Sequence, residues 1–261
     1  MTLRYVVADV FTDTALTGNQ LAVFTDGREV DDETMQKLAR EMNFSETVFV
    51  LPPEAGGHAR IRIFTPSSEL PFAGHPVLGS AFVLAAPLQL GEIRLETGSG
   101  VVPVTLERDG ARIVFGWMQQ PIPTFESFER ADEIQEILGV RSSLPVELYR
   151  LGPGHVFLEL GSEEEVAGLA PDFGALVSFE PGINCFAGSG TRWKTRMFAP
   201  SSGVAEAKGV DVDDQGGQQD HAAHPLPDED VELELVEAVV EDAEDEQADD
   251  GVLDAALAAE Q

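Results

Sequence analysis

A seven-residue pattern that occurs twice constrains this chain more than any other feature. Arg62-Ile-Phe-Thr-Pro-Ser-Ser68 returns as Arg196-Met-Phe-Ala-Pro-Ser-Ser202, at a constant offset of 134 residues. A sequence repeat at that distance indicates two copies of one structural unit. The first copy continues into an apolar segment, whereas the sequence after Glu206 no longer follows the first copy. The chain is therefore expected to hold one complete unit and one incomplete unit.

The repeat and the composition together divide the chain into three parts. We expect a first domain over residues 1–117, a partial second domain over 118–206 and an acidic tail over 207–261. Of the 47 acidic residues in the chain, 20 lie from Ala205 onward, where Lys208 is the one basic residue. A segment with that much charge cannot bury a core, so the tail is predicted to be disordered.

Charge and cysteine content exclude several classes of protein. The formal net charge of −31 repels nucleic acid, so no nucleic-acid partner is expected. Cys185 is the single cysteine, which excludes an internal disulfide. No run approaches the roughly 18 apolar residues that cross a membrane, and the N-terminus has the pattern of a strand rather than of a signal peptide. A cytoplasmic protein without a membrane partner is predicted.

Hydrophobic periodicity predicts a mixture of strands and helices. Residues 59–65 alternate with period two, as in a half-buried strand, whereas 76–86 are apolar all round, as in a buried helix. Without a strict strand–helix rhythm, the α+β class is favoured. Further strands are expected over 3–11, 21–24, 47–51, 92–97, 100–107, 111–117, 146–151, 155–160, 183–187 and 191–198; further helices over 33–43, 131–138 and 163–169, with a weak one possible over 231–240 or 252–259.

Two side chains are candidates for chemistry. Glu46 stands where a loop enters an apolar strand, and partial burial there would suit its carboxylate to proton transfer, although such a glutamate is more often simply solvated. His75 stands in a Gly74-His75-Pro76 turn ahead of the buried helix. The amides of that helix N-terminus would face whatever His75 faces, which predicts a site for a substrate carboxylate. The histidines lack metal-ligand spacing, so no metal is expected.

Four segments resemble the PhzF-like isomerases of phenazine biosynthesis, which have the diaminopimelate epimerase-like fold. The resemblance covers about residues 3–206. It is carried by Asp9-Val-Phe-Thr12, Thr17-Gly-Asn-Gln-Leu-Ala-Val-Phe24, Asn43-Phe-Ser-Glu-Thr-Val-Phe49 and the segment from Arg62-Ile-Phe-Thr-Pro66 to Leu70-Pro-Phe-Ala-Gly-His-Pro76.

The resemblance implies a fold and an activity. Two pseudo-symmetric domains would each wrap a curved mixed sheet around a central buried helix, with the active site between them. Glu46 matches the catalytic glutamate, which moves a proton between carbons of a small cyclic or amino-acid-like carboxylate. Gly74 and His75 match residues that line the substrate pocket. No cofactor is implied, and a homodimer is usual.

The resemblance also implies a loss. The family continues after the second copy with a segment that gives an aspartate, a serine and helix amides to the site, followed by a second buried helix. Residues 207–261 do not match it, so that helix and the strands after it are expected to be absent and catalysis to be impaired. Two alternatives stay open: a catalytically inactive remnant, and a small-carboxylate binding protein with an acidic interaction or solubility tail.

Overall fold

A computed structural model describes residues 3–12, 16, 18–120, 122–190, 192–207, 232–236 and 238–240. The chain separates into two compact units, and the second begins at Gln120. Each unit is built on its own mixed sheet. Within the described residues no helix has the length and apolar character needed to span a membrane.

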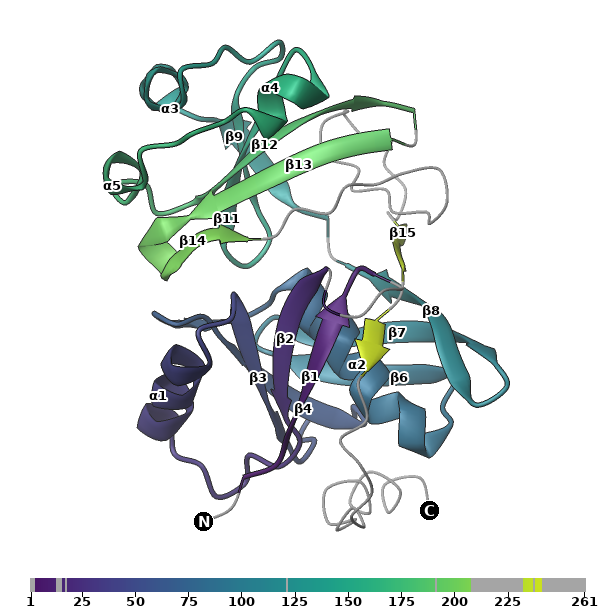
Figure 1. The fold of residues 1–261 in the computed structure, drawn as a ribbon. Coiled ribbons are helices and arrows are strands. Elements are labelled where there is room, and N and C mark those ends of the chain that lie inside the picture. The colour runs from purple at the N-terminus through teal and green to yellow at the C-terminus, as the bar shows by residue number, and fades with distance from the viewer. Residues whose placement is uncertain are drawn as a thin grey trace. The chain divides into compact units, whose positions relative to one another are not determined.

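The first unit is a ten-stranded sheet in the order β15-β8-β7-β6-β4-β3-β2-β1-β16, with β5 paired to β4; its outermost strands are β15 (Glu232–Val236) and β16 (Ala238–Val240). The neighbours β2–β3 and β4–β6 are parallel, whereas pairs such as β1–β2, β3–β4, β6–β7 and β7–β8 are antiparallel, so the sheet is mixed. It curls into a half-barrel (Figure 1). Its strands from the N-terminal part are β1 (Tyr5–Val10), β2 (Asn19–Phe24), β3 (Glu46–Leu51), β4 (Ala59–Phe64), β5 (Glu69–Leu70), β6 (Glu92–Thr97), β7 (Gly100–Asp109) and β8 (Arg112–Gln119).

Helix α2 (Gly74–Leu88) fills the curve of this sheet (Figure 1). It contacts β1, β2, β3, β6, β7, β8 and β16, so strands surround it. All of its residues from His75 to Ala85 are buried, which is why its sequence is apolar on every side. The buried helix predicted over 76–86 is confirmed and is longer than expected.

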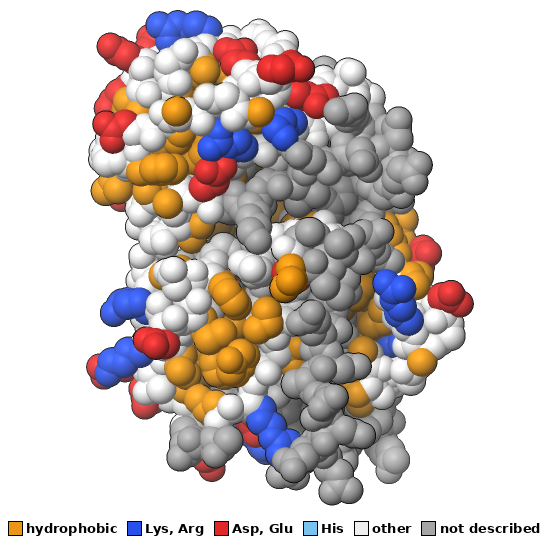
Figure 2. Space-filling model, in the orientation of Figure 1, with side chains coloured by type: hydrophobic (Ala, Val, Ile, Leu, Met, Phe, Trp, Pro, Cys, Tyr) orange, Lys and Arg blue, Asp and Glu red, His pale blue; other side chains and the backbone are white. Residues whose placement is uncertain are grey.

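Helix α1 (Asp32–Met42) covers the opposite face of β2, β3 and β4. Its buried Met35 and Ala39 pack on three phenylalanines, Phe24, Phe49 and Phe64, one from each strand. The Asp31 side chain caps the helix by accepting a hydrogen bond from the Thr34 amide at 2.9 Å. Figure 2 shows hydrophobic side chains gathered over the β1–β3 part of the surface, where Tyr5 and Val7 of β1 are the exposed hydrophobic residues.

Glycine at position 79 allows α2 to approach β1 and β2 closely. A Cβ built on Gly79 would lie 2.6 Å from Leu21 and 2.8 Å from Val10. We expect Gly79→Ala to lower the free energy of unfolding by about 1–3 kcal/mol, because the added methyl overpacks the core. Urea unfolding measures this, with Gly91→Ala as the control, since no atom lies within 4 Å of a Cβ there. Equal stability of the two variants would contradict the close approach.

The second unit is a six-stranded sheet in the order β14-β13-β12-β11-β10-β9. Three short helices contribute Ile134, Val166 and Leu176 to its core, with Cys185 and other sheet residues opposite them. Its elements are β9 (Thr124–Ser127), α3 (Ala131–Leu138), β10 (Glu147–Arg150), β11 (Gly154–Glu159), α4 (Glu163–Ala167), α5 (Phe173–Leu176), β12 (Gly182–Ser189), β13 (Arg192–Ala199), the 3-10 turn η1 (Pro200–Ser202) and β14 (Val204–Ala207).

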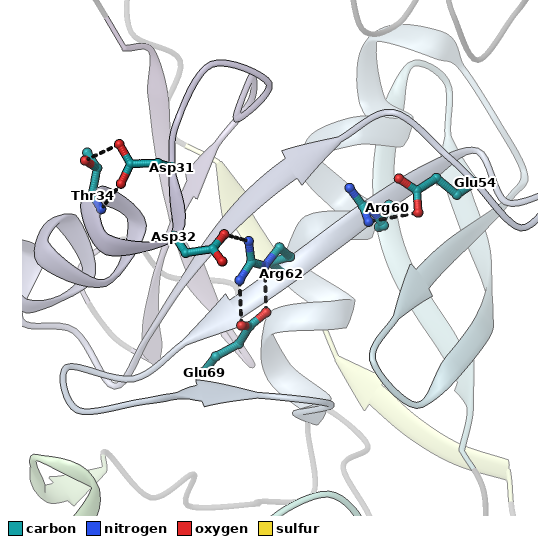
Figure 3. A network of polar contacts seen from close by, with 7 residues as sticks. All are labelled: Asp31, Asp32, Thr34, Glu54, Arg60, Arg62 and Glu69. Atoms are coloured by element: carbon teal, nitrogen blue, oxygen red, sulfur yellow. Dashed lines mark hydrogen bonds and ion pairs between the residues drawn. The ribbon is translucent and has the colours of Figure 1, made fainter.

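The repeated motif has the same local structure in both units. In the first copy Arg62 forms a two-pronged ion pair with Glu69 at 2.6 and 2.7 Å (Figure 3), and its guanidinium lies 5.1 Å from the Phe64 ring. In the second copy Arg196 pairs in the same way with Glu206 at 2.6 and 2.9 Å and lies 5.1 Å from the Phe198 ring. Each arginine thus ties a long strand to the short strand after the turn.

The C-terminal part contributes strands where the sequence predicts a disordered tail. Strand β15 (Glu232–Val236) pairs with β8, and β16 (Ala238–Val240) pairs with β1. The possible helix over 231–240 and the disorder expected for these residues are therefore wrong, and both strands join the sheet of the first unit. The reason is a period-two pattern inside the acidic run, Glu232-Leu-Glu-Leu-Val236, which suits a strand. Residues 208–231 and 241–261, and with them the possible second buried helix and the one over 252–259, lie outside the described residues.

Candidate active site

Glu46 is the first residue of β3, at the end of the sheet where α2 begins. Its side chain is 12% exposed. The parallel pairing of β2 with β3 sets Leu21 opposite Glu46, so the start of β2 lies next to the Phe44-Ser45 segment. The sequence predicts that the Glu46 carboxylate lies at the edge of a core, and its low exposure confirms this.

His75 lies inside the first turn of α2 rather than in a turn ahead of it. The helix begins at Gly74, with Ala73 as an N-cap that supplies no side-chain hydrogen bond. The N–H groups of the first helical residues have no partner within the helix, and Pro76 has no N–H to satisfy. His75 is 8% exposed, and its Nδ1 lies 3.3 Å from Glu46 Oε2. The structure therefore brings Gly74, His75 and Glu46 together.

Two polar residues that sequence reasoning did not assign complete this cluster. The Ser45 hydroxyl donates to Asn19 Oδ1 at 3.0 Å, and Asn19 Nδ2 lies 3.3 Å from His75 Nδ1. Asn19 begins β2, immediately after Gly18, whose φ of 70° lies in the left-handed region. The signal in the sequence is the Gly-Asn turn, which can place a polar side chain at the end of a strand.

Two buried polar atoms in the cluster have no hydrogen-bond partner among the described residues. They are Glu46 Oε2 and His75 Nε2. Buried polar atoms in a folded protein are nearly always paired, so each of these two atoms needs a partner such as a bound water, ion or ligand. A carboxylate oxygen can take a proton, and an imidazole nitrogen can donate or accept one.

The environment of His75 favours the uncharged imidazole. Burial lowers the pKa of His75 below its usual 6.5, against the opposing effects of the Glu46 charge and of a backbone hydrogen bond with Gln20. The short distance to Glu46 is therefore a contact with a neutral ring at neutral pH, and it is not an ion pair. A neutral imidazole keeps one N–H donor and one bare nitrogen.

Acidification is expected to destabilise the protein through its buried histidines. Burial lowers the pKa of His155 as well as that of His75. The folded state holds these rings neutral while the unfolded chain takes up protons below about pH 6.5, so stability is complete above that pH and declines below it. We expect the urea midpoint to fall between about pH 7.5 and 5.5, and less so in His155→Gln. Identical pH dependence of variant and parent would contradict this.

An aromatic ring from the β1–β2 connection borders the cluster. The Phe11 ring centroid lies 6.2 Å from that of His75. Phe11 has a φ of 66°, which is strained for a residue with a side chain, and such strain is concentrated at binding sites. Asp9 Oδ2 accepts a hydrogen bond from the Leu16 amide at 2.6 Å and so helps hold this connection.

Two other titratable groups in the described residues, Cys185 and Glu96, are not part of this cluster. Burial raises the pKa of the Cys185 thiol to about 12, so that thiol is no base at neutral pH. A cavity of about 600 Å³ in the first unit is lined by Arg60, Glu54 and Glu96 but not by Glu46 or His75. The Glu96 carboxylate accepts three backbone hydrogen bonds that anchor the loop beside it. Among the described residues no group of three or more acidic, histidine or cysteine side chains is arranged for a metal ion.

Comparison with protein families identifies one match over most of the chain. The model described as PhzC-PhzF, phenazine biosynthesis-like protein, matches residues 8–208. The match ends close to Glu206, where the second copy of the repeat stops following the first. The trans-2,3-dihydro-3-hydroxyanthranilate isomerase of Pseudomonas aeruginosa is 51% identical over 205 residues, which cover 78% of this chain and 74% of that protein. The enzyme of the same name from Pseudomonas chlororaphis is 48% identical with the same coverage.

Solved structures agree with this match. A PhzC/PhzF protein from Clostridium difficile aligns with a TM-score of 0.67 at 25% identity, over 95% of this chain and 100% of that one. A PhzF-family protein from Bacillus anthracis aligns with a TM-score of 0.68 at 23% identity, over 83% and 79%. A probable proline racemase from Agrobacterium radiobacter aligns at 0.54 and 11% identity, over 79% and 72%, and shows the shared diaminopimelate epimerase-like fold.

Proposed function

Because the chain belongs to the PhzC-PhzF phenazine biosynthesis-like family, we propose that it is an isomerase of trans-2,3-dihydro-3-hydroxyanthranilate. Identity near 50% to two curated enzymes of that name supports the substrate. The substrate is a small cyclic carboxylate with an amino and a hydroxyl group, in line with the class expected from the sequence.

The proposed reaction is a proton shift within the substrate ring. A base removes a proton from one ring carbon, the electron pair of the broken C–H bond moves through the conjugated double bonds, and a proton is added at another carbon. Reactant and product have the same atoms and electrons, so the balance requires no oxidant or reductant. One carboxyl group that first accepts and then returns a proton is sufficient.

In this proposal Glu46 is the acid–base residue and His75 and Gly74 bind the substrate. The buried Glu46 Oε2 has no hydrogen-bond partner among the described residues and is available to a carbon-bound proton. The N–H groups at the start of α2 and the positive end of its dipole favour the substrate carboxylate. The equally unpaired His75 Nε2 offers a further hydrogen bond to the substrate.

One observation carries the proposal: the unpaired Glu46 Oε2 and His75 Nε2 are both buried, on residues 3.3 Å apart, at the start of the central helix. The test is turnover of trans-2,3-dihydro-3-hydroxyanthranilate by the full chain in deuterated water, followed by NMR of the product. We expect conversion, with deuterium at the ring carbon that receives the proton. No conversion at any enzyme concentration would overturn the proposal.

That experiment, together with a measurement of the melting temperature with and without substrate, decides between the alternatives. A carboxylate-binding protein raises its melting temperature with the substrate but does not convert it, and an inactive remnant does neither. Impaired catalysis, expected from the sequence after Glu206, predicts conversion with a low kcat. A cytoplasmic location and a homodimer remain proposals, and sedimentation of the purified chain tests the second.

A further inference from the structure

We propose that Asn19 is a positioning residue that keeps His75 in the Nε2–H tautomer and so leaves the Glu46 carboxylate without an internal hydrogen-bond donor. The inference deepens the proposed function, and its catalytic part rests on that function. Its structural part, the position of one proton on His75, is independent of turnover.

Two neighbours of His75 Nδ1 favour opposite protonation states. Asn19 Nδ2 and Glu46 Oε2 each lie 3.3 Å from this nitrogen. An amide NH₂ can only donate, so it favours a bare Nδ1, whereas a carboxylate can only accept, so it favours Nδ1–H. A neutral imidazole carries one proton, and the stronger of the two neighbours decides which nitrogen holds it.

The hydrogen bonds in the site favour Asn19. The Ser45 hydroxyl donates to Asn19 Oδ1 at 3.0 Å, and in this arrangement Asn19 presents its Nδ2 to the imidazole. The contact between His75 and Glu46 does not have hydrogen-bond geometry, and Glu46 Oε2 is left without a partner among the described residues. With Nδ1 accepting from Asn19, the proton lies on the buried Nε2, which then points an N–H at the substrate.

This arrangement matters for a base that must take a proton from carbon. A hydrogen bond from Nδ1–H would stabilise the ionised Glu46 carboxylate and oppose the uptake of that proton. By occupying Nδ1, Asn19 removes that donor. The other groups at the ring are the Phe11 side chain, which carries no charge, and the backbone of Gln20, whose hydrogen bond raises the pKa of His75 and so favours a proton on the ring.

Nitrogen-15 NMR of the imidazole rings in the full chain tests the proton position directly. At neutral pH we expect His75 Nδ1 to have the chemical shift of a bare nitrogen and Nε2 that of a protonated one. His58 provides an internal reference, because its Nδ1 accepts from the Arg94 backbone N–H at 2.9 Å, and that donor fixes the Nε2–H form. A protonated Nδ1 on His75 in the unmodified protein would overturn the inference.

Two variants test whether Asn19 is the cause. Asn19→Leu removes the donor at similar size, and we expect the His75 proton to move to Nδ1, facing Glu46. Ser45→Ala removes only the orienting hydroxyl and should give a mixture of tautomers. Asn184→Asp is the matched control, since Asn184 Nδ2 lies 3.0 Å from His155 Nδ1 in the second unit; it should alter the His155 signals and not those of His75.

The kinetics distinguish positioning from loss of structure. For Asn19→Leu we expect kcat to fall roughly 10-fold to 100-fold while KM changes less than about threefold, because the lost effect is on proton transfer. If His75 stays in the Nε2–H form in Asn19→Leu, Asn19 is not the cause and the inference fails. An unmodified protein with the expected tautomer but no turnover would instead overturn the proposed function alone.

Discussion

Replacing Glu46 by Gln is expected to abolish isomerisation while leaving the fold intact. The amide is nearly isosteric with the carboxyl group but cannot accept a proton, so a residue that both removes and returns the proton loses both steps. General acid–base groups contribute roughly 100-fold to 10,000-fold, and we expect kcat for Glu46→Gln to fall by at least that range. Deuterium in the product, measured by NMR, reports the addition of the proton, and deuterium in the recovered substrate reports its removal.

Glu41→Gln is the matched control for this experiment. Glu41 is exposed on α1, five residues before Glu46, and the same loss of one negative charge there should leave kcat unchanged. Both variants should have nearly the same urea midpoint of unfolding as the unmodified protein. Measurable turnover with deuterium transfer in Glu46→Gln would show that another group is the base.

The largest effect on stability is expected for Phe82→Ala in the middle of α2. Phe82 is 2% exposed and faces Gly116 of β8 at the centre of the first unit. Removal of a buried aromatic ring costs its transfer free energy and leaves a cavity, so we expect the free energy of unfolding to fall by about 3–5 kcal/mol. Urea unfolding followed by far-UV circular dichroism measures the difference.

Phe125→Ala is the control for this loss of stability. Phe125 is 59% exposed on β9 and stacks on Tyr149, so its removal should cost no more than about 1 kcal/mol. If Phe82→Ala proves as stable as Phe125→Ala, α2 is not the centre of the core. The first transition of unfolding is the relevant one, because the two units need not unfold together.

Long periodic segments were predictable from the sequence, and short elements were not. Buried and partly exposed positions alternate along Ala59–Phe64, as in a strand. The sequence within α2 is apolar on all sides, as in a buried helix. Strand β5 has two residues and α5 has four, too few for a period to be recognised. Strand β5 is defined instead by its pairing with β4, and α5 by its packing on α3 and η1.

The candidate site was predictable in part for the same reason. Glu46 and His75 were found from their positions at the start of a strand and beside a buried helix. Asn19 was not, because its contact with His75 depends on how β2 aligns with β3, and nothing local in the sequence fixes that alignment. The acidic part misled in another way: its overall charge concealed the alternation in Glu232-Leu-Glu-Leu-Val236.

The pairing of β16 with β1 and of β15 with β8 has a consequence for synthesis on the ribosome. Val10 and its partner Ala238 are separated by most of the chain, so at ribosomal rates β1 waits on the order of ten seconds or more for that partner. Throughout that time the nascent first unit presents two unprotected sheet edges, which are sites of aggregation. Yield from cells should therefore depend on translation speed and chaperone supply more than the stability of the finished protein would suggest.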